Sequence, residues 1–329
     1  MKRSIGPDQA RDSKVAIVIV HYNGENLIRM CLKSLRKTNY SDYRIFVFDN
    51  GSTDNTAEII TNEFPEATLF SVPKNLGLTK AANKAFSLAM EAYHCDYIAF
   101  LNNDIEVISP DWLSGMVQTA QEIKGTGVVG CKLLYPDGTI QHAGELFWPD
   151  RLRGKGESAE KYGSVEELRA VTFAASLIRT EVFKKIGFFD EVFSPFYYED
   201  LDFCFRAKKS GFKSVYAGNV SLTHHEGGSL KFNTEHEYIV ARNAIIFYAR
   251  YAPLFEFMKI VARIYLRLII RRADKRKDFG KGNVSILLSP TDLIMLPYRI
   301  LLISMAIFHG LLLYRKNKVP VYPLSLFIL

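Results

Sequence analysis

The sequence lacks the short motifs of several large protein classes. It has no G-x-x-x-x-G-K-S/T loop, no G-x-G-x-x-G after its first strand-like segment and no G-x-S-x-G elbow. These absences argue against a P-loop enzyme, a Rossmann dinucleotide domain and an α/β-hydrolase. The four cysteines are far apart, so there is no C-x-x-C metal or redox motif. We expect all four to be reduced and buried as small hydrophobic side chains.

Acidic residues are scarce in one part of the chain only. Residues 1–249 carry 28 basic and 31 acidic side chains, whereas residues 250–329 carry 14 basic and 4 acidic ones. The net charge of +7 therefore arises in the C-terminal quarter. This asymmetry predicts a near-neutral body with a basic attachment surface.

The N-terminus lacks an apolar run. Residues 1–13 are polar, and no hydrophobic segment follows Lys2 and Arg3. We expect these residues to be disordered rather than to form a signal peptide, and the body to fold in the cytoplasm.

The chain does contain an alternation of strand-like and helix-like segments. Buried strands are predicted at 15–20, 43–48, 68–72 and 97–101. Helices are predicted at 25–36, from Asn55, whose spacing to Glu58 is that of a capping box, and around 82–89. This order predicts an α/β domain with a mostly parallel sheet.

The alternation becomes less regular after residue 105. We expect a helix at 199–210, a mobile polar loop at 148–165, and strands at 128–134, 171–178 and 215–223.

Polar residues follow each of the first four predicted strands. They are His21–Asn23, Asp49–Asp54, Asn75–Gly77 and Asn102–Asp104. Any one of these groups is an ordinary turn sequence, but parallel strands bring their carboxyl ends to one edge, where ligands bind. Because the sequence has no P-loop, the charge of a phosphate ligand must be neutralised by another positive group. A divalent cation on Asp104 is the natural one, because hard oxygen ligands favour Mg²⁺ or Mn²⁺.

The order of these segments resembles glycosyltransferase family 2. The resemblance covers residues 14–250 and rests on VAIVIVHYN, DNGSTD, NLG, LNND, YYEDLDF and HHEGGS in that order. It is greatest to bacterial rhamnosyltransferase-like members that build surface polysaccharide. It implies a GT-A fold and inverting transfer of a sugar from a nucleotide diphosphate.

The resemblance implies a donor site at the sheet edge. Tyr22 and Asp49 would contact the nucleotide base, and Asn102 and Asp104 match the two ends of the family's D-x-D motif. Asp104 would hold the metal and Asn102 would face the ribose. The asparagine leaves one carboxylate where many members have two.

Four more residues are expected to contact the donor or to lie beside it. Asn23, Asn75 and Gly77 belong to the loops that follow the strands. Lys80 either reaches the diphosphate or is a solvated helix residue.

Three acids follow the aromatic stretch at 194–198, which either stacks on an acceptor sugar or belongs to the core. The resemblance implies that Asp200 is the catalytic base, which takes the proton of the attacking hydroxyl. Glu199 and Asp202 are the other candidates and expected substrate contacts. Acids at the start of a helix are also ordinary partners of the helix dipole.

The resemblance further implies that His224 is a metal ligand. Neighbouring residues of a strand face opposite ways, so we expect only one of His224 and His225 to join the site, and favour His224. His21 and His142 are expected to be structural.

The C-terminal region combines apolar and basic residues. Between 254 and 272 a basic residue recurs every fourth position in an otherwise apolar sequence, at Lys259, Arg263, Arg267 and Arg271. This pattern predicts a helix at an anionic membrane surface, with a buried helix that has a solvated basic edge as the alternative. Nucleic acid is a poorer fit, because apolar residues outnumber the basic ones.

Residues 293–313 are the only candidate for a membrane span. They contain Pro297, Arg299 and His309, and basic residues flank both ends. We favour a segment that lies on the membrane over one that crosses it.

The sequence therefore predicts a metal-dependent inverting glycosyltransferase on the cytoplasmic face of the cell membrane. The catalytic domain would span 14–250 and the membrane-associated helical tail 251–329. The donor would be a UDP- or dTDP-sugar, and the acceptor a lipid-linked glycan. The alternatives are a nucleotidyltransferase, or a non-catalytic membrane-bound sugar-binding or scaffold protein.

Overall fold

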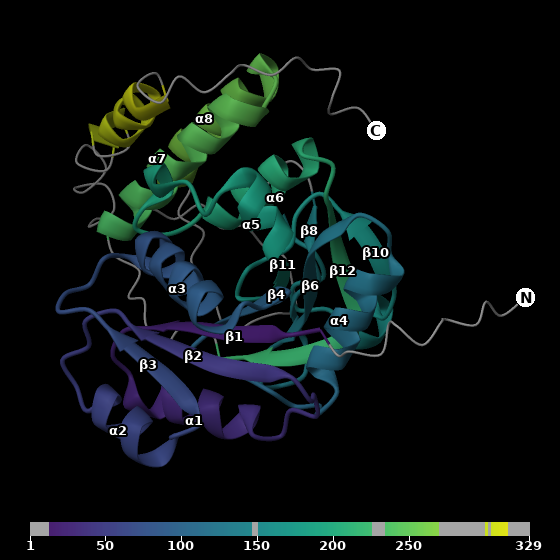
Figure 1. Cartoon of the computed structure of the whole chain (residues 1–329). Coiled ribbons are helices and arrows are strands. Elements are labelled where there is room, and N and C mark those ends of the chain that lie inside the picture. Colours follow the sequence, from purple (N-terminus) through teal and green to yellow (C-terminus); the bar gives the residue numbers. More distant parts are fainter. Residues whose placement is uncertain (1–12, 147–150, 226–233, 270–299, 302–303, 315–329) are drawn as a thin grey trace, which may run out of the picture. The chain divides into compact units, whose positions relative to one another are not determined.

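The chain folds into two compact units, Met1–Leu230 and Lys231–Leu329. The structure is a computed structural model, and it describes residues 13–146, 151–225, 234–269, 300–301 and 304–314 (Figure 1). The predicted N-terminal disorder concerns residues that lie almost entirely outside these ranges.

The N-terminal part of the first unit alternates strands and helices as predicted. The strands are β1 (Val15–His21), β2 (Tyr43–Asp49), β3 (Ala67–Ser71) and β4 (Tyr97–Asn102). The helices between them are α1 (Glu25–Leu35), α2 (Thr56–Glu63) and α3 (Leu78–Tyr93). Helix α2 follows Asn55 as predicted, but without the capping box, because the Asn55 side chain donates to Glu25 Oε1 instead.

The rest of the first unit adds strands to the same sheet. These are β5 (Ile105–Glu106), β6 (Thr126–Leu134), β7 (Ile140–His142), β10 (Val165–Leu168), β11 (Ala175–Arg179) and β12 (Lys213–His224). The sheet order is β10-β12-β6-β11-β4-β1-β2-β3, with β5 paired to β12 and β7 to β6. Strands β1 to β4 are parallel, β11 is antiparallel to both β4 and β6, and β12 runs parallel to β6.

The remaining elements of this unit were partly predicted. Helix α6 (Glu199–Lys209) matches its prediction, whereas α4 (Trp112–Glu122) and α5 (Thr180–Ile186) were not foreseen. The predicted strand at 171–178 begins only at residue 175. The described part of the predicted loop at 148–165 contains β9 (Arg151–Leu152), paired with β8 (Glu145–Leu146), then the short helix η2 (Ala159–Tyr162) and the start of β10.

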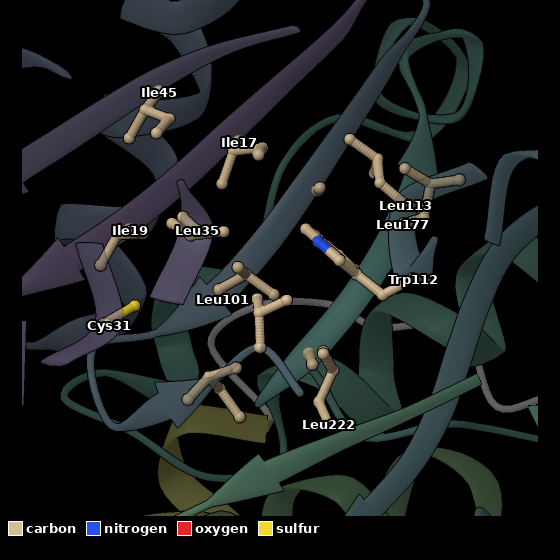
Figure 2. Packing of buried hydrophobic residues seen from close by; sticks show 14 of the residues in the cluster. Ile17, Ile19, Cys31, Leu35, Ile45, Leu101, Trp112, Leu113, Leu177 and Leu222 are labelled. Carbon is tan, nitrogen blue, oxygen red and sulfur yellow. The ribbon is translucent and has the colours of Figure 1, made fainter. Parts of the chain in front are cut away.

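A hydrophobic layer covers each face of the sheet. Strand β1 is apolar from Val15 to Val20 because both of its faces are buried. Its alternate residues Val15, Ile17 and Ile19 join the layer that also contains α1 and α4, and the residues between them join the layer of α3 and α6. Figure 2 shows the first layer, where Trp112 packs among Leu101, Leu177 and Leu222. All four cysteines are free and buried, as predicted.

The second unit is helical where it is described. It contains α7 (Thr234–Tyr251), α8 (Leu254–Ile269) and helical residues at 300–301 and 304–314. Part of the candidate span 293–313 lies outside the described residues. Within the described ones, no helix has both the length and the apolarity needed to cross a bilayer.

Candidate active site

The carboxyl ends of β1 to β4 meet at one edge of the sheet. His21 is paired with Asp49, Asp49 with Ser71, and Val20 with Asn102 in the strand registers. The loops that follow these strands carry the polar groups singled out in the sequence. The predicted gathering of these loops at one edge is thus confirmed.

The loop after β2 is held against the loop after β1. Asn23 accepts a hydrogen bond from the Thr53 amide at 2.9 Å and donates its own amide to Ser52 Oγ at 2.9 Å. The Asp49 carboxylate is buried and accepts from the Ser52 amide at 2.9 Å. Asn23 therefore shapes the loop through its side chain, while Tyr22 beside it is exposed.

His21 joins the loop after β4 to the start of α2. Asn103 Nδ2 donates to His21 Nδ1 at 2.7 Å, so His21 Nε2 donates to Thr56 Oγ1 at 3.0 Å. Thr56 in turn donates to Asp54 at 2.6 Å. Burial lowers the pKa of His21, although the carboxylates of Asp54 and Asp49 oppose this effect. His21 is thus a structural link. Asn103 belongs to the polar group that the sequence places after the fourth strand, but its bond to His21 was not predicted.

The loop after β3 packs on the segment that leads into α6. Asn75 accepts hydrogen bonds from Asn50 Nδ2 and from the Gly77 amide, at 3.0 and 2.8 Å. Gly77 has φ +79°, and a Cβ at this position would lie 2.7 Å from Pro195 Cβ. The Thr79 amide donates to the Pro195 carbonyl at 3.1 Å. Asn75 and Gly77 therefore bring two distant segments together, whereas the Lys80 side chain is exposed.

A short antiparallel pairing brings Asp104 to His224. Strand β5 pairs with the end of β12, where Ile105 lies opposite His224, and the His225 amide donates to the Asp104 carbonyl at 2.9 Å. Asp104 Oδ1 lies 3.0 Å from His224 Nε2, and both residues are buried. His225 faces away and contacts Glu106 at 2.8 Å.

The second nitrogen of His224 faces Gln141 on β7. His224 Nδ1 lies 2.6 Å from the amide oxygen of Gln141, which can only accept a hydrogen bond. Nδ1 therefore carries a proton, and in the neutral imidazole this leaves the lone pair on Nε2, which faces Asp104. His142 beside Gln141 is buried and accepts from the Gly144 amide at 3.0 Å.

This pair fits a divalent cation. Among the described residues, the buried Asp104 Oδ1 has no hydrogen-bond partner. Asp104 Oδ1 and His224 Nε2 lie 3.0 Å apart, and neighbouring ligands that are each about 2.1 Å from an octahedral ion are separated by about that distance. No cluster of three or more His, Cys, Asp or Glu ligands occurs in the described part of the chain. Two protein ligands suit Mg²⁺ or Mn²⁺, which often take the remainder from substrate phosphates and water.

The three acids of α6 have different surroundings. Asp202 is fully buried, and its carboxylate accepts from Arg206 Nε at 2.7 Å. Arg206 also donates to the carbonyls of Ile186 and Phe188. Asp202 therefore anchors the helix, in contrast to the substrate contact expected from the sequence.

Glu199 and Asp200 differ in exposure. Glu199 is buried, its Oε2 has no hydrogen-bond partner among the described residues, and burial next to the Asp200 charge raises its pKa well above the ordinary value. Asp200 is only partly buried and accepts from the Leu201 amide at 2.8 Å. Asp200 is thus the most accessible carboxylate of the three.

Backbone contacts tie Asp200 to the sheet edge. The Phe173 amide lies 3.4 Å from Asp200 Oδ2, and the next residue, Ala174, accepts a hydrogen bond from the Asn102 amide at 2.8 Å. Asn102 itself is half-buried at the end of β4. Phe173 and Ala174 therefore connect the start of α6 with the end of β4.

The family model for glycosyl transferase family 2 matches residues 16–187, which include β1 to β4 and the acidic residue after β4. The chain belongs to this family.

Sequence relatives agree with this membership of glycosyl transferase family 2. The O-antigen biosynthesis protein RfbC of Myxococcus xanthus is 29% identical over 73% of this chain and 19% of its own length. An uncharacterized protein, y4gI of Sinorhizobium fredii, is 32% identical over 65% of this chain and 25% of its own length. The chain thus spans a quarter or less of these two relatives. An N-acetylglucosaminyl-diphospho-decaprenol L-rhamnosyltransferase of Mycobacterium tuberculosis is 24% identical over 65% of this chain and 76% of its own length.

Solved structures give the same fold for this family 2 member. GalNAc-T7 with UDP, GalNAc and Mn²⁺ matches with a TM-score of 0.57 at 14% identity, over 96% of this chain and 59% of that one. The mannosyltransferase PcManGT of Pyrobaculum calidifontis, in complex with GDP-Man and Mn²⁺, matches with a TM-score of 0.53 at 14% identity, over 97% and 91%. The fold is that of the GT-A nucleotide-diphospho-sugar transferases, as predicted.

Proposed function

We propose that this protein is an inverting, metal-dependent glycosyltransferase that moves a sugar from a nucleoside-diphosphate sugar to a glycan. The observation that carries the proposal is the shared sheet edge. It brings Asp104 and His224, whose Oδ1 and Nε2 atoms lie 3.0 Å apart, to the same edge as the partly exposed Asp200.

Asp200 is the proposed general base. In an inverting transfer the attacking hydroxyl loses its proton as the new bond to the anomeric carbon forms, and a partly exposed carboxylate can accept it. Glu199 is unsuited to this task, because its burial and raised pKa keep it protonated to higher pH. It could instead donate a hydrogen bond to a sugar hydroxyl. The fully paired Asp202 takes no part in the reaction.

Asp104 and His224 are the proposed metal ligands. A bound divalent cation would act as a Lewis acid for the departing nucleoside diphosphate. The two solved neighbours that contain Mn²⁺ together with a nucleotide support this proposal. Tyr22 and Asp49 are proposed to contact the base, Asn102 the ribose, and Lys80 the diphosphate. Asn23, Asn75 and Gly77 hold the loops that surround the donor.

We propose a UDP- or dTDP-sugar as donor, and a lipid-linked glycan of cell-surface polysaccharide synthesis as acceptor. The lipid-linked acceptor is supported by the rhamnosyltransferase relative, whose name contains a diphospho-decaprenol, and by the O-antigen relative. We also propose that the enzyme acts at the cytoplasmic face of the cell membrane, where it could reach such an acceptor.

A panel of nucleotide sugars tests the proposal. The protein is incubated with UDP-, dTDP- and GDP-sugars and Mg²⁺ or Mn²⁺, and both thermal stabilisation and nucleoside diphosphate release are measured. We expect one donor to stabilise the protein only with the metal, and to release its nucleoside diphosphate. Stabilisation without release under any condition would favour a non-catalytic sugar-binding protein. Pyrophosphate release from a nucleoside triphosphate and a sugar phosphate would favour a nucleotidyltransferase.

A further inference from the structure

Large exposed hydrophobic side chains are concentrated in the second unit. Among the described residues, eight of the twelve such side chains lie between residues 254 and 312. Soluble monomers seldom gather exposed apolar side chains in this way without a partner for them.

Three of these exposed hydrophobic side chains lie on helix α8. Leu254, Phe255 and Met258 are 76, 69 and 56% exposed. Lys259 and Arg263 follow them on the exposed side of the same helix. The opposite side of α8 faces inward, where Ile260 is buried. The helix is thus amphipathic, with basic residues beside an exposed apolar face.

Three more of the exposed hydrophobic side chains lie on the helical residues 304–314. Ala306 is fully buried, and Gly310 packs so closely on α7 that an added Cβ would lie 2.9 Å from the Arg242 carbonyl oxygen. The exposed face holds Met305, Phe308 and Leu312, which are 55, 65 and 40% exposed. Their spacing of three and four residues makes them neighbours on a helix.

We propose that these two apolar faces, with the basic residues of α8, form a membrane-binding surface for anionic lipid. We call it the lipid-binding surface; it comprises Leu254, Phe255, Met258, Lys259, Arg263, Met305, Phe308 and Leu312. Amphipathic helices of this composition lie in the headgroup region with their apolar side chains inserted. This inference does not depend on the proposed glycosyl transfer.

Charge favours lipid over other occupants. Residues 250–329 carry 14 basic and only 4 acidic side chains, so a second copy of this surface would be repelled. Nucleic acid would neutralise the charge but leave the Leu, Phe and Met side chains in water. An anionic bilayer would both neutralise the basic charge and take up the exposed apolar side chains.

Vesicle binding by the full chain tests this surface. Co-sedimentation is measured with phosphatidylcholine vesicles and with vesicles that also contain phosphatidylglycerol. We expect binding that prefers the anionic vesicles. Met305→Ser with Phe308→Ser, and separately Lys259→Ala with Arg263→Ala, should each weaken it about tenfold. The control is Ile108→Ser, which changes a 47% exposed side chain of the first unit and should bind as the wild type does.

Three outcomes would overturn the proposal. One is no binding to either kind of vesicle. A second is equal binding by the wild type and both double variants. The third is a concentration-dependent dimer in light scattering that the Met305→Ser, Phe308→Ser variant abolishes, since the surface would then bind a second copy.

A separate observation concerns Gln141, which lies on β7 beside His224. It is 3% exposed, and its amide oxygen lies 2.6 Å from His224 Nδ1. We infer that Gln141 is a positioning residue that fixes the tautomer and orientation of His224 for metal binding. This inference rests on the proposed metal site. A metal-binding histidine needs an acceptor on its other nitrogen, and loss of such an acceptor costs roughly 10–100-fold in metal affinity.

Mn²⁺ affinity, measured by the electron paramagnetic resonance signal of the free ion in the presence of UDP, tests this role without any turnover. We expect Gln141→Leu to weaken binding by about 10–100-fold, while Gln141→Glu, which keeps the acceptor, binds at least as tightly as the wild type. Gln118→Leu makes the same change on α4, where the Gln118 side chain donates to the exposed Glu122 at 2.7 Å, and should have no effect.

The outcomes separate the two proposals. If the wild type binds no Mn²⁺, the metal site and the role of Gln141 both fail. If the wild type binds Mn²⁺ and Gln141→Leu binds it equally well, only the role of Gln141 fails. Equal weakening by the Leu and Glu variants, with both still folded by thermal unfolding, would show that Gln141 acts through packing rather than as an acceptor.

Discussion

The residues at the sheet edge are of two kinds. Some have side chains that hold the loops by hydrogen bonds, and others have a buried oxygen that accepts no hydrogen bond from the described residues. Asn23, Asn75 and His21 use their side chains within the protein. Asp104 and Glu199 each keep a buried oxygen without a hydrogen-bond partner among the described residues. Buried polar atoms of this kind are costly, which is why they point to a ligand.

The His21 link predicts a pH-dependent stability. The native pKa of His21 lies below the value of about 6.5 for an unfolded histidine, because the ring is buried. Between these two values the unfolded chain binds a proton that the native chain does not, so stability is complete above about pH 6.5 and falls as the pH decreases below it. We expect His21→Gln to lose less unfolding free energy than the wild type between pH 7.5 and 5.5 in urea titrations. An equal loss in both proteins would contradict the assignment.

A substitution at Gly77 should destabilise the protein through a steric clash, and a comparison with Gly138 separates this clash from backbone strain. Gly77→Ala places a Cβ 2.7 Å from Pro195 at φ +79°, so we expect a loss of about 2–4 kcal/mol in the free energy of unfolding. Gly138 shares the positive φ, at +84°, but has open space around it, and Gly138→Ala should cost only about 1–2 kcal/mol. Chemical denaturation of the two variants measures the difference. Equal losses would mean that the contact with Pro195 is unimportant.

Helix α6 combines a structural acid with a candidate catalytic one. Asp202 is fully buried and paired with Arg206, whereas Asp200 lies at the accessible start of the helix. The helix is thereby anchored in the protein through Asp202, while Asp200 stays accessible for the proposed proton transfer.

Asparagine substitutions should separate these two roles. Asp202→Asn leaves Arg206 without its charged partner, and we expect a loss of about 3 kcal/mol or more in unfolding free energy. Asp200→Asn should change stability by less than about 1 kcal/mol, since Asp200 is only partly buried and the asparagine side-chain oxygen can still accept from the Leu201 amide. Urea unfolding of both variants tests the contrast, and the reverse order would overturn it.

The sequence predicted the elements whose signals are local. The β-branched run of β1 and the apolar spacing in α3 depend on burial patterns that a short window reveals. The pairing of the two-residue strand β5 with β12, more than a hundred residues later, has no local signal. That pairing places Asp104 beside His224. The position of Asp104 after a parallel strand indicated it from the sequence, whereas only the resemblance to the family indicated His224. Gln141 and the bond of Asn103 to His21 were missed because the partner residues are distant in sequence.

At the scale of the whole molecule, the proposed site and the proposed lipid-binding surface belong to different compact units. The proposed site residues all precede residue 230, and the lipid-binding surface lies entirely after it. The uneven charge of the sequence follows the same division, since the basic excess belongs to residues 250–329.

This division predicts that the two functions can be separated. The Met305→Ser, Phe308→Ser variant should bind the donor and release nucleoside diphosphate with water as acceptor at the wild-type rate, because no site residue is changed. Thermal stabilisation by the donor and the rate of nucleoside diphosphate release measure this. Loss of donor binding in a folded variant would show that the second unit contributes to the donor site.

The central claim is that Asp200 is the base of a sugar transfer. It is tested most directly by nucleoside diphosphate release from Asp200→Asn, with donor binding followed by thermal stabilisation in the same samples. We predict that release falls by about 10²–10⁴-fold, while stabilisation by donor and Mn²⁺ is retained. Release at the wild-type rate by a folded Asp200→Asn protein would contradict the account.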